Sequence, residues 1–336
     1  MIEIENLNTK NPKEFWAALK KLGPRQNVTI PLEVYDDDGQ VTADLPTVFS
    51  KWNSEYENLF KGYNNADFDA EYLEEVKQSL QILENDPDIN YAINTPITLH
   101  EVKAVLKKTK LNKAVGLDNL PYEIMKNHQS SVLLQNLFQK MFTSSIIPSL
   151  WRKTILKPIP KSSTIDPRIP LKYRGIALLS TVYKLYSNIL NRRIYKYLEE
   201  NELIHEEQNG FRQGRSCADH LFVLNTIIRN RLLNNEPTYV AFLDAEKAFD
   251  RIDRTLLLYK LLKLGINGHL YENLKTIYSE TLCCIKLDKL LTDWFKTESG
   301  VLQGDTLLPT LFNVFINDLV TEINFLRYGI QINDFM

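Results

Sequence analysis

The 336-residue chain is 44% hydrophobic and 24% charged, with a net charge of −2 at pH 7, which fits a globular protein and excludes a disordered or fibrous one. It contains no apolar run of about 18 residues, so we expect no membrane span, and its first residues lack the features of a signal peptide. Cys217, Cys283 and Cys284 have no metal-ligand spacing. We therefore expect a reduced, intracellular setting.

The small net charge hides an uneven distribution. Residues 1–100 carry 8 basic and 18 acidic side chains, residues 101–230 carry 21 and 10, and residues 231–336 carry 11 and 14. A basic central third is typical of a surface that faces a polyanion. A solvated, lysine-rich surface explains it equally well.

Residues 1–94 are predicted to form a mainly helical accessory segment. It includes a strand, an acidic turn at Gly39 and a second strand in "EVYDDDGQVTADLP", followed by helices within 45–83. A further helix is predicted to begin at Thr98, because Glu101 three residues later completes a capping box.

The central part of the chain alternates loops and helices. "KLNKAVGLDNLPYEIMK" is predicted to be a loop, and the two prolines of "WRKTILKPIPK" limit that stretch to an edge strand or an extended loop. Apolar residues at helical spacing predict a helix in "LLSTVYKLYSNILNRRIYKYLEEN".

The last third is predicted to mix strands and helices. An apolar run, residues 239–243, is expected to be a buried strand that ends on Asp244. A helix in "RTLLLYKLLKLG" is expected to stop at Gly265. "CCIKLDKLLTDWFKTESGV" then indicates strand, turn and strand, and "TLLPTLFNVFINDLVTEI" a helix with Pro309 in its first turn.

The stretch "FLDAEKAFD" suggests chemistry at Asp244. A carboxylate at the end of a buried strand faces the rim of a cleft, where it can bind a hard divalent cation. Two such cations can stabilise the attacking and leaving oxygens of a phosphoryl transfer. Asp244 as an ordinary turn or helix-cap residue is the alternative.

Five motifs, in this order along the chain, resemble those of one family. They are "NKAVGLDNLPYEIMK"; "LKPIPK" with "YRGIALLSTVYKLYSNILNRRI"; "EEQNGFRQGRSCADHLFVL"; "FLDAEKAFD"; and "GVLQGDTLLPTLFNVFINDL". Together they resemble the reverse transcriptases of non-LTR (LINE-type) retrotransposons over roughly residues 95–330. One departure is Gly175, which stands where many relatives have proline.

This resemblance implies an α+β fold, the fingers and partial palm of a right-hand polymerase. The fingers would be residues 95–235 and the partial palm residues 236–336, without a thumb. Residues 1–94 resemble the linker between the endonuclease and the polymerase of longer relatives.

The resemblance also implies a magnesium and sugar site. Asp244 would bind two catalytic Mg²⁺ ions, with the backbone carbonyl of Ala245 as a further ligand. Phe249 would lie under the incoming sugar and exclude a 2′-hydroxyl. For Asp250 we expect a structural role, as a turn or helix-cap carboxylate.

Three further residues are implied to bind the incoming nucleotide. Arg174 would reach the triphosphate, a role that suits the bidentate guanidinium group. Gln303 would lie against the nucleotide, and Gly304 would let the backbone approach it closely.

Four basic residues are candidates for contacts with the template backbone. They are Lys157, Lys161, Arg212 and Arg215. Such contacts would add salt-dependent affinity without sequence specificity. For the two lysines, a place on a solvated edge is an equally good interpretation.

The implied activity is RNA-directed DNA synthesis, by two-metal nucleotidyl transfer to a primer 3′-hydroxyl. Its partners would be an RNA template, a DNA primer or target and dNTPs, at a nuclear site of action, without a membrane or an obligate protein partner. The family's second aspartate motif is expected after residue 330 and is not found before Met336. We therefore expect little or no polymerase activity from this chain alone. The alternatives are a catalytically dead retroelement fragment that at most binds nucleic acid, and a decayed product without activity.

Overall fold

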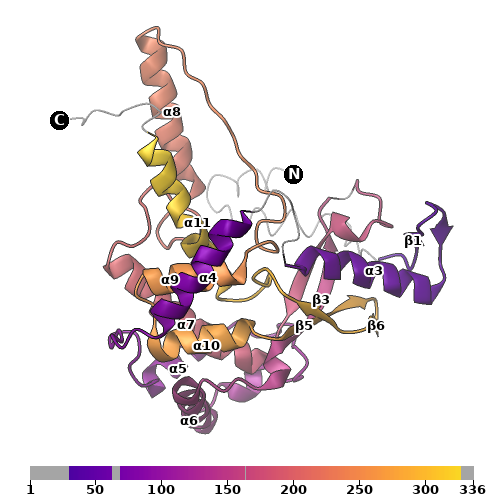
Figure 1. Cartoon of the computed structure of the whole chain (residues 1–336). Helices are drawn as coiled ribbons and strands as arrows, with labels where there is room; N and C mark the ends of the chain where they lie inside the picture. The colour runs from indigo at the N-terminus through magenta and orange to yellow at the C-terminus, as the bar shows by residue number, and fades with distance from the viewer. Residues whose placement is uncertain (1–29, 63–68, 163, 327–336) are drawn as a thin grey trace, which may run out of the picture.

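The computed structural model describes residues 30–62, 69–162 and 164–326 (Figure 1). The first 29 residues of the predicted accessory segment, and the last ten residues of the chain, lie outside the described residues. The elements are, in chain order, β1 (Val34–Tyr35), β2 (Val41–Thr42), α3 (Leu45–Phe60), α4 (Ala70–Glu84), α5 (Leu99–Lys108), η1 (Tyr122–Met125), α6 (His128–Ser144), η2 (Ser149–Arg152), β3 (Lys153–Pro160), η3 (Pro170–Lys172), β4 (Tyr173–Leu178), α7 (Thr181–Glu200), α8 (Cys217–Leu233), α9 (Arg254–Lys263), α10 (Gly268–Tyr278), β5 (Thr281–Leu287), β6 (Leu290–Leu291), β7 (Phe295–Thr297) and α11 (Leu308–Phe325).

The main sheet is mixed, with strand order β4-β3-β5-β6 and β7 paired to β5. Strand β3 runs antiparallel to β4 over 155–160 and parallel to β5 over 153–156. The prediction of an edge strand or loop is therefore wrong for the first half of β3, which is central. Pro158 and Pro160 lie beyond the part of β3 that pairs with β5. In this part β3 has only β4 as a neighbour, so the N–H groups that the prolines lack are not needed to bond to a second strand.

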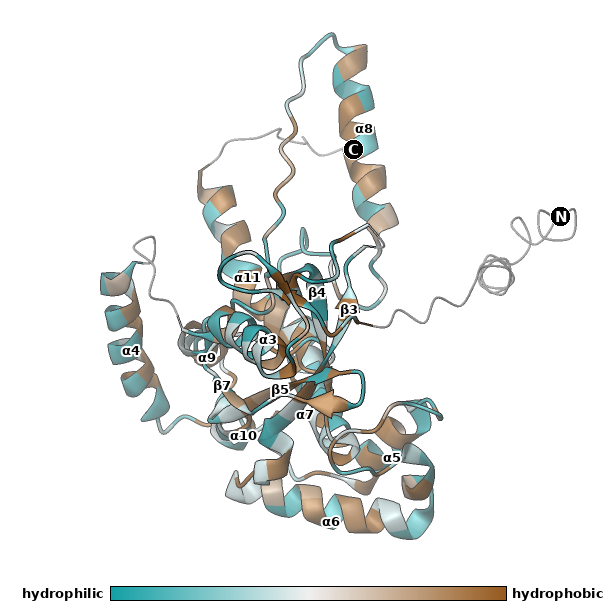
Figure 2. Ribbon diagram, turned by 90° about the vertical axis from the view of Figure 1, so that its right-hand side faces the viewer, coloured by the Kyte–Doolittle hydropathy of each residue, from teal (hydrophilic) through white to brown (hydrophobic). Residues whose placement is uncertain are grey.

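Helices α5, α6, α7 and α10 pack together at one end of the molecule, and α8 projects from the other end in both views (Figures 1 and 2). The predicted helices α7, α9 and α11 are confirmed. The predicted stop after α9 is confirmed too, because Gly265 has a φ of +78°. None of the described helices is long and apolar enough to cross a membrane.

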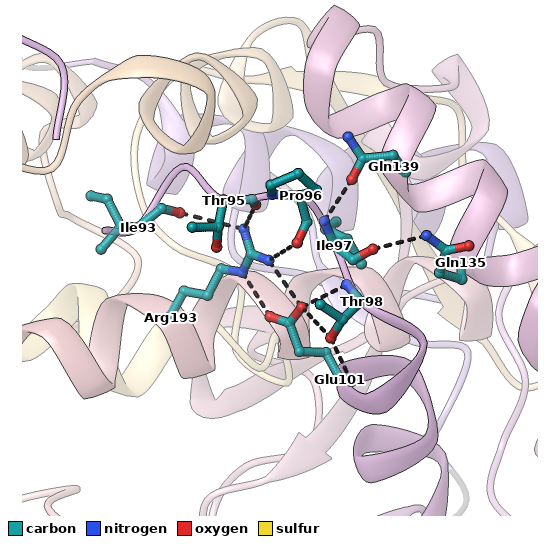
Figure 3. A network of polar contacts seen from close by, with 9 residues as sticks. All are labelled: Ile93, Thr95, Pro96, Ile97, Thr98, Glu101, Gln135, Gln139 and Arg193. Carbon is teal, nitrogen blue, oxygen red and sulfur yellow. Dashed lines mark hydrogen bonds and ion pairs between the residues drawn. The ribbon is translucent and has the colours of Figure 1, made fainter. Parts of the chain in front are cut away.

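The predicted capping box at the start of α5 is also present and belongs to a larger network (Figure 3). The guanidinium of Arg193, on α7, donates to both carboxylate oxygens of Glu101, at 2.8 and 2.9 Å. It also donates to the carbonyls of Thr95 (2.6 Å) and Pro96 (3.0 Å). Because this bidentate pair is largely buried, it fixes α5 and the chain before it onto α7.

One apolar cluster includes residues from all three segments predicted from the sequence. Trp52 of α3, Leu190 of α7 and Leu311 of α11 are fully buried members of it. The boundaries at 94/95 and 235/236 stay predictions, but they do not separate independent cores among the described residues.

The predicted strand at residues 239–243 is not formed. Residues 236–245 are an irregular link that returns from the far end of α8 (Figure 1). Tyr239, Phe242 and Leu243 are 93%, 85% and 92% exposed. A strand needs a neighbour to satisfy its backbone groups, and no strand of the described residues pairs with this stretch.

Candidate active site

A cavity of about 430 Å³ gathers most of the residues singled out by the sequence. We call it the central cavity. Its lining includes six predicted site residues: Lys161, Arg174, Asp244, Ala245, Phe249 and Gln303. Gly304 follows Gln303 directly, while Lys157, Arg212 and Arg215 do not line the cavity.

The turn after Asp244 forms one wall of the central cavity. The backbone N–H of Val301 donates to the carbonyl of Phe249 at 3.0 Å, which ties this turn to the chain leading into Gln303. The Phe249 ring packs edge-on against Phe312 of α11 (centroids 4.8 Å apart) and near Phe211 (6.1 Å). These contacts hold the ring in one orientation beside the cavity.

The loop that carries Gln303 lies against β4. The N–H of Ala177 donates to the carbonyl of Gln303 at 2.7 Å. Gly304 has a φ of +112°, and a Cβ there would lie 3.1 Å from the Ala177 carbonyl oxygen. Only glycine suits this backbone conformation, so the sequence places Gln303 close to the strand that carries Arg174.

Below this loop lies a buried carboxyl group that the sequence analysis missed. Asp305 accepts a hydrogen bond from the Tyr183 hydroxyl (2.6 Å) and one from the Leu307 N–H (3.2 Å). Burial raises the pKa of Asp305, and these hydrogen bonds oppose the rise. Since Tyr183 belongs to α7, the pair anchors the Gln303 loop to the helical end of the molecule.

Asp250 lines the central cavity and lies in a turn, which confirms the first of the two places expected for it; it does not cap a helix. The cap of α9 is Asp253, which accepts from the Leu256 N–H at 2.8 Å. Asp250 lies in the preceding turn. Burial raises its pKa to about 6, and the positive charges of Lys161 and Lys247 limit this rise.

This shifted pKa predicts a pH dependence of stability. The folded-state pKa of about 6 exceeds the ordinary aspartate pKa of 3.8, so the folded state binds the proton more tightly than the unfolded state. The protein therefore loses stability as the pH rises from about 4 to 6. We expect Asp250→Asn to remove this part of the dependence, a difference below about 3 kcal/mol because the carboxyl is only half-buried. Urea unfolding of wild type and Asp250→Asn at pH 4, 5, 6 and 7 measures this difference. If the free energies of unfolding of the two proteins changed with pH in the same way, Asp250 would not be the source of the dependence.

Helix α3 forms a wall of the central cavity that no motif indicated. Tyr56, Leu59 and Phe60 line it, and the Phe60 carbonyl accepts from the N–H groups of Glu298 (2.9 Å) and Ser299 (3.0 Å). A Cβ on Gly175 would lie 2.9 Å from the Tyr56 ring. Gly175, noted in the sequence only as a departure from many relatives, therefore leaves room for the Tyr56 ring.

The four candidate template contacts differ in whether their positive charges are already paired with a carboxylate. Lys157 is exposed on β3, and Lys161 donates to the Leu171 carbonyl at 3.1 Å. Arg212 is almost fully buried and pairs with Glu199 at 2.8 Å, while Arg215 pairs with Glu206. The two arginines therefore already have carboxylate partners.

The described residues do not form a complete site for two magnesium ions. No group of three or more histidine, cysteine, aspartate or glutamate side chains in the described part of the chain could hold a metal ion. Asp244 and Ala245 lie on the exposed wall of the cavity. One carboxylate and one carbonyl are too few protein ligands to hold two Mg²⁺ ions, each of which takes near-octahedral oxygen coordination.

Comparison with known proteins agrees with the motifs. A family model described as "Reverse transcriptase (RNA-dependent DNA polymerase)" matches residues 159–336. "Transposon TX1 uncharacterized 149 kDa protein" of Xenopus laevis is 27% identical over 304 residues, which are 90% of this chain and 22% of that protein. "RNA-directed DNA polymerase from mobile element jockey" of Drosophila melanogaster is 28% identical over 229 residues, 67% of this chain and 25% of that protein.

A protein of a third element is also similar. "Retrovirus-related Pol polyprotein from type-1 retrotransposable element R2" of Popillia japonica is 25% identical over 229 residues, 68% of this chain and 31% of that protein. The chain thus spans between about a fifth and a third of the length of these curated relatives. Because the family model matches more than half of it, the chain belongs to the reverse transcriptase family.

Proposed function

We propose that the central cavity is the incoming-nucleotide site of an RNA-directed DNA polymerase, with residues 95–235 as its fingers and 236–336 as part of its palm. The observation that carries the proposal is the convergence of Arg174, Phe249 and Gln303 on one cavity. They come from β4, from the turn before α9 and from the loop before α11. Their separation in sequence makes a chance meeting of three motif residues improbable.

Each of these residues has a role that its surroundings support. Arg174 is exposed and has no carboxylate partner among the described residues, so its guanidinium is available to a triphosphate. The ring of Phe249, held by Phe312, would block a 2′-hydroxyl by bulk. Gln303 and Gly304 would support the nucleotide from the side of β4.

Asp244 and the carbonyl of Ala245 are the two groups proposed to bind magnesium. Bound Mg²⁺ would stabilise the charge on the reacting oxygens. Since the described residues do not complete such a site, no step of the reaction is assigned to them beyond binding and orienting the nucleotide.

The nucleic acid partners follow from the family. An RNA template and a DNA primer would approach the central cavity, with Lys157 and Lys161 on β3 and its following loop as phosphate contacts. Arg212 and Arg215 stay candidates for contacts with the template. Each guanidinium would then have to bind a phosphate as well as its present glutamate partner. A nuclear site of action belongs to the same proposal.

Binding of a fluorescent dNTP tests this assignment. We expect Arg174→Ala to weaken the affinity about 10- to 100-fold, because a hydrogen bond to a charged group contributes about 1.5–3 kcal/mol. Lys289→Ala, at the exposed β5–β6 turn, is the matched control. The proposal fails if the wild-type chain does not bind dNTP, or if Arg174→Ala binds it as well as the control does.

A second candidate function is nucleic-acid binding without catalysis. It is favoured by the exposed position of Asp244 and by the lack of a metal-binding cluster among the described residues. Primer extension on an RNA template distinguishes the two candidates. Synthesis that depends on Asp244 supports the polymerase, and binding of the hybrid without extension supports the second candidate.

A further inference from the structure

The Gln303 loop, residues 301–307, leads into α11 without regular secondary structure. Leu302 and Asp305 are buried, whereas Gln303 is half-buried and Gly304 is exposed. The N–H of Asp305 donates to the carbonyl of Leu302 at 2.9 Å, which closes a turn with Gln303 and Gly304 at its tip. Because this turn belongs to no helix or strand, contacts with other parts of the chain have to hold it in place.

The carboxyl group of Asp305 accepts hydrogen bonds on both of its oxygens. One oxygen accepts from the hydroxyls of Tyr183 (2.6 Å) and Tyr278 (3.4 Å), and the other accepts from the N–H of Leu307 (3.2 Å). Both tyrosines are buried. The Asp305 side chain therefore lies between the Gln303 loop and the helices α7 and α10, which carry the two tyrosines.

Asp305 is a buried acid that has no paired cation. It forms no ion pair with the described residues, and burial lowers the pKa of Lys184 while the Asp305 charge only opposes this shift. A buried carboxylate without a paired cation destabilises a fold. Burial raises the pKa of Asp305 despite its hydrogen bonds, so these bonds offset only part of the cost. A group of this kind beside a binding cavity indicates a role other than stability.

Helix α7 holds the Gln303 loop at two successive residues. Tyr183 and Ser187 are four residues apart and therefore share one face of α7. Tyr183 donates to Asp305 at 2.6 Å, and the hydroxyls of Ser187 and Thr306 share a hydrogen bond of 2.5 Å. The position of Gln303, two residues before Asp305, therefore depends on α7.

We propose that Asp305, held by Tyr183, is a positioning residue that fixes Gln303 and Gly304 in place for the ligand of the central cavity. Asp305 itself does not line the cavity. It therefore acts through the two residues at the tip of the turn and not by contact with the ligand. The identity of this ligand as a dNTP rests on the proposed function, whereas the positioning of the turn rests on the hydrogen bonds.

Removal of the Tyr183 hydroxyl tests this role. Tyr183→Phe keeps the ring, which packs edge-on against Trp151 (centroids 5.9 Å apart). We expect it to weaken the binding of a fluorescent dNTP about 3- to 10-fold, because Gln303 is then less firmly held. Tyr186→Phe is the matched control. Its hydroxyl is also buried on α7, but it donates to the side chain of Asn273 on α10 (2.6 Å) and not to the Gln303 loop.

A double-mutant cycle separates positioning from a loss of stability. If the Tyr183 hydroxyl acts through Gln303, Tyr183→Phe should weaken dNTP binding less than about twofold once Gln303 has been replaced by alanine. A purely structural effect would be the same in both backgrounds. Tyr186→Phe should lower the free energy of unfolding in urea about as much as Tyr183→Phe does, yet leave dNTP binding within about twofold of wild type.

Amide hydrogen exchange reports the position of the loop without a ligand. The N–H of Ala177 donates to the carbonyl of Gln303 at 2.7 Å. It should therefore exchange faster in Tyr183→Phe than in wild type and in Tyr186→Phe. Thr306→Val removes the other hydroxyl contact with α7 and should act in the same direction, so it replaces Tyr183→Phe if that variant does not fold.

The outcomes separate this inference from the proposed function. The inference is overturned if Ala177 exchanges equally fast in Tyr183→Phe and Tyr186→Phe, or if the effect of Tyr183→Phe on dNTP binding is undiminished in Gln303→Ala. Equal binding of dNTP by the two tyrosine variants would overturn it as well. If wild type binds no dNTP but Ala177 exchanges faster in Tyr183→Phe, the proposed function is rejected and the positioning of Gln303 by Asp305 stays in place.

Discussion

Arg254→Met is expected to destabilise the protein by at least about 3 kcal/mol, because the substitution leaves several buried acceptors without a donor. The Arg254 guanidinium is buried and donates to the carbonyls of Gly300 (3.0 Å), Tyr278 (3.0 Å) and Thr297 (2.8 Å). It also donates to the hydroxyl of Thr281 at 2.8 Å. This one side chain therefore joins α9, α10, β5 and β7 just before the Gln303 loop begins.

Urea unfolding followed by circular dichroism measures the effect. Arg254→Lys should be intermediate, since one ammonium group can reach only part of this set of acceptors. Lys289→Met, on the exposed turn, should change the free energy of unfolding by less than about 0.5 kcal/mol. A loss below about 1 kcal/mol for Arg254→Met would show that the buried acceptors find other donors.

Trp52→Ala is expected to cost about 3–5 kcal/mol, the range for removing a buried tryptophan. Trp52 is fully buried in α3, where its ring stacks with Tyr56 (centroids 6.0 Å apart) and meets Tyr173 of β4 edge-on (5.2 Å). Because α3 also walls the central cavity, the same variant should weaken dNTP binding.

A matched variant makes the Trp52 prediction sharper. The indole N–H of Trp52 has no hydrogen-bond partner in the described part of the protein, so Trp52→Phe removes no hydrogen bond. It leaves a smaller cavity than Trp52→Ala and should therefore cost less than Trp52→Ala does. Separate unfolding transitions for α3 and the rest of the chain would contradict the single core. A single, cooperative transition is expected for wild type and for both variants.

Local sequence signals predicted the helices well. The capping box of Thr98 and Glu101 is formed as expected, and α7 and α11 follow their apolar spacing. These features depend on residues within a few positions of one another. The motifs were equally informative for the central cavity, because Arg174, Phe249 and Gln303 meet there.

Features that depend on distant parts of the chain were less predictable. Strand β3 is central because β5, more than a hundred residues later, pairs with it. Residues 239–243 have the composition of a strand, but no described strand pairs with them. The cavity wall from Tyr56 and the buried Asp305 were missed for the same reason, since their partners Gly175 and Tyr183 are far away in sequence.

Photocrosslinking with an azido-substituted dATP shows whether the nucleotide binds in the central cavity, whether or not synthesis follows. We predict that the label attaches to the peptides that contain Phe249 and Gln303, that unlabelled dATP competes with it, and that Arg174→Ala reduces it. Labelling spread over surface peptides, or concentrated on residues outside the lining of the central cavity, would show that the cavity is not the nucleotide site.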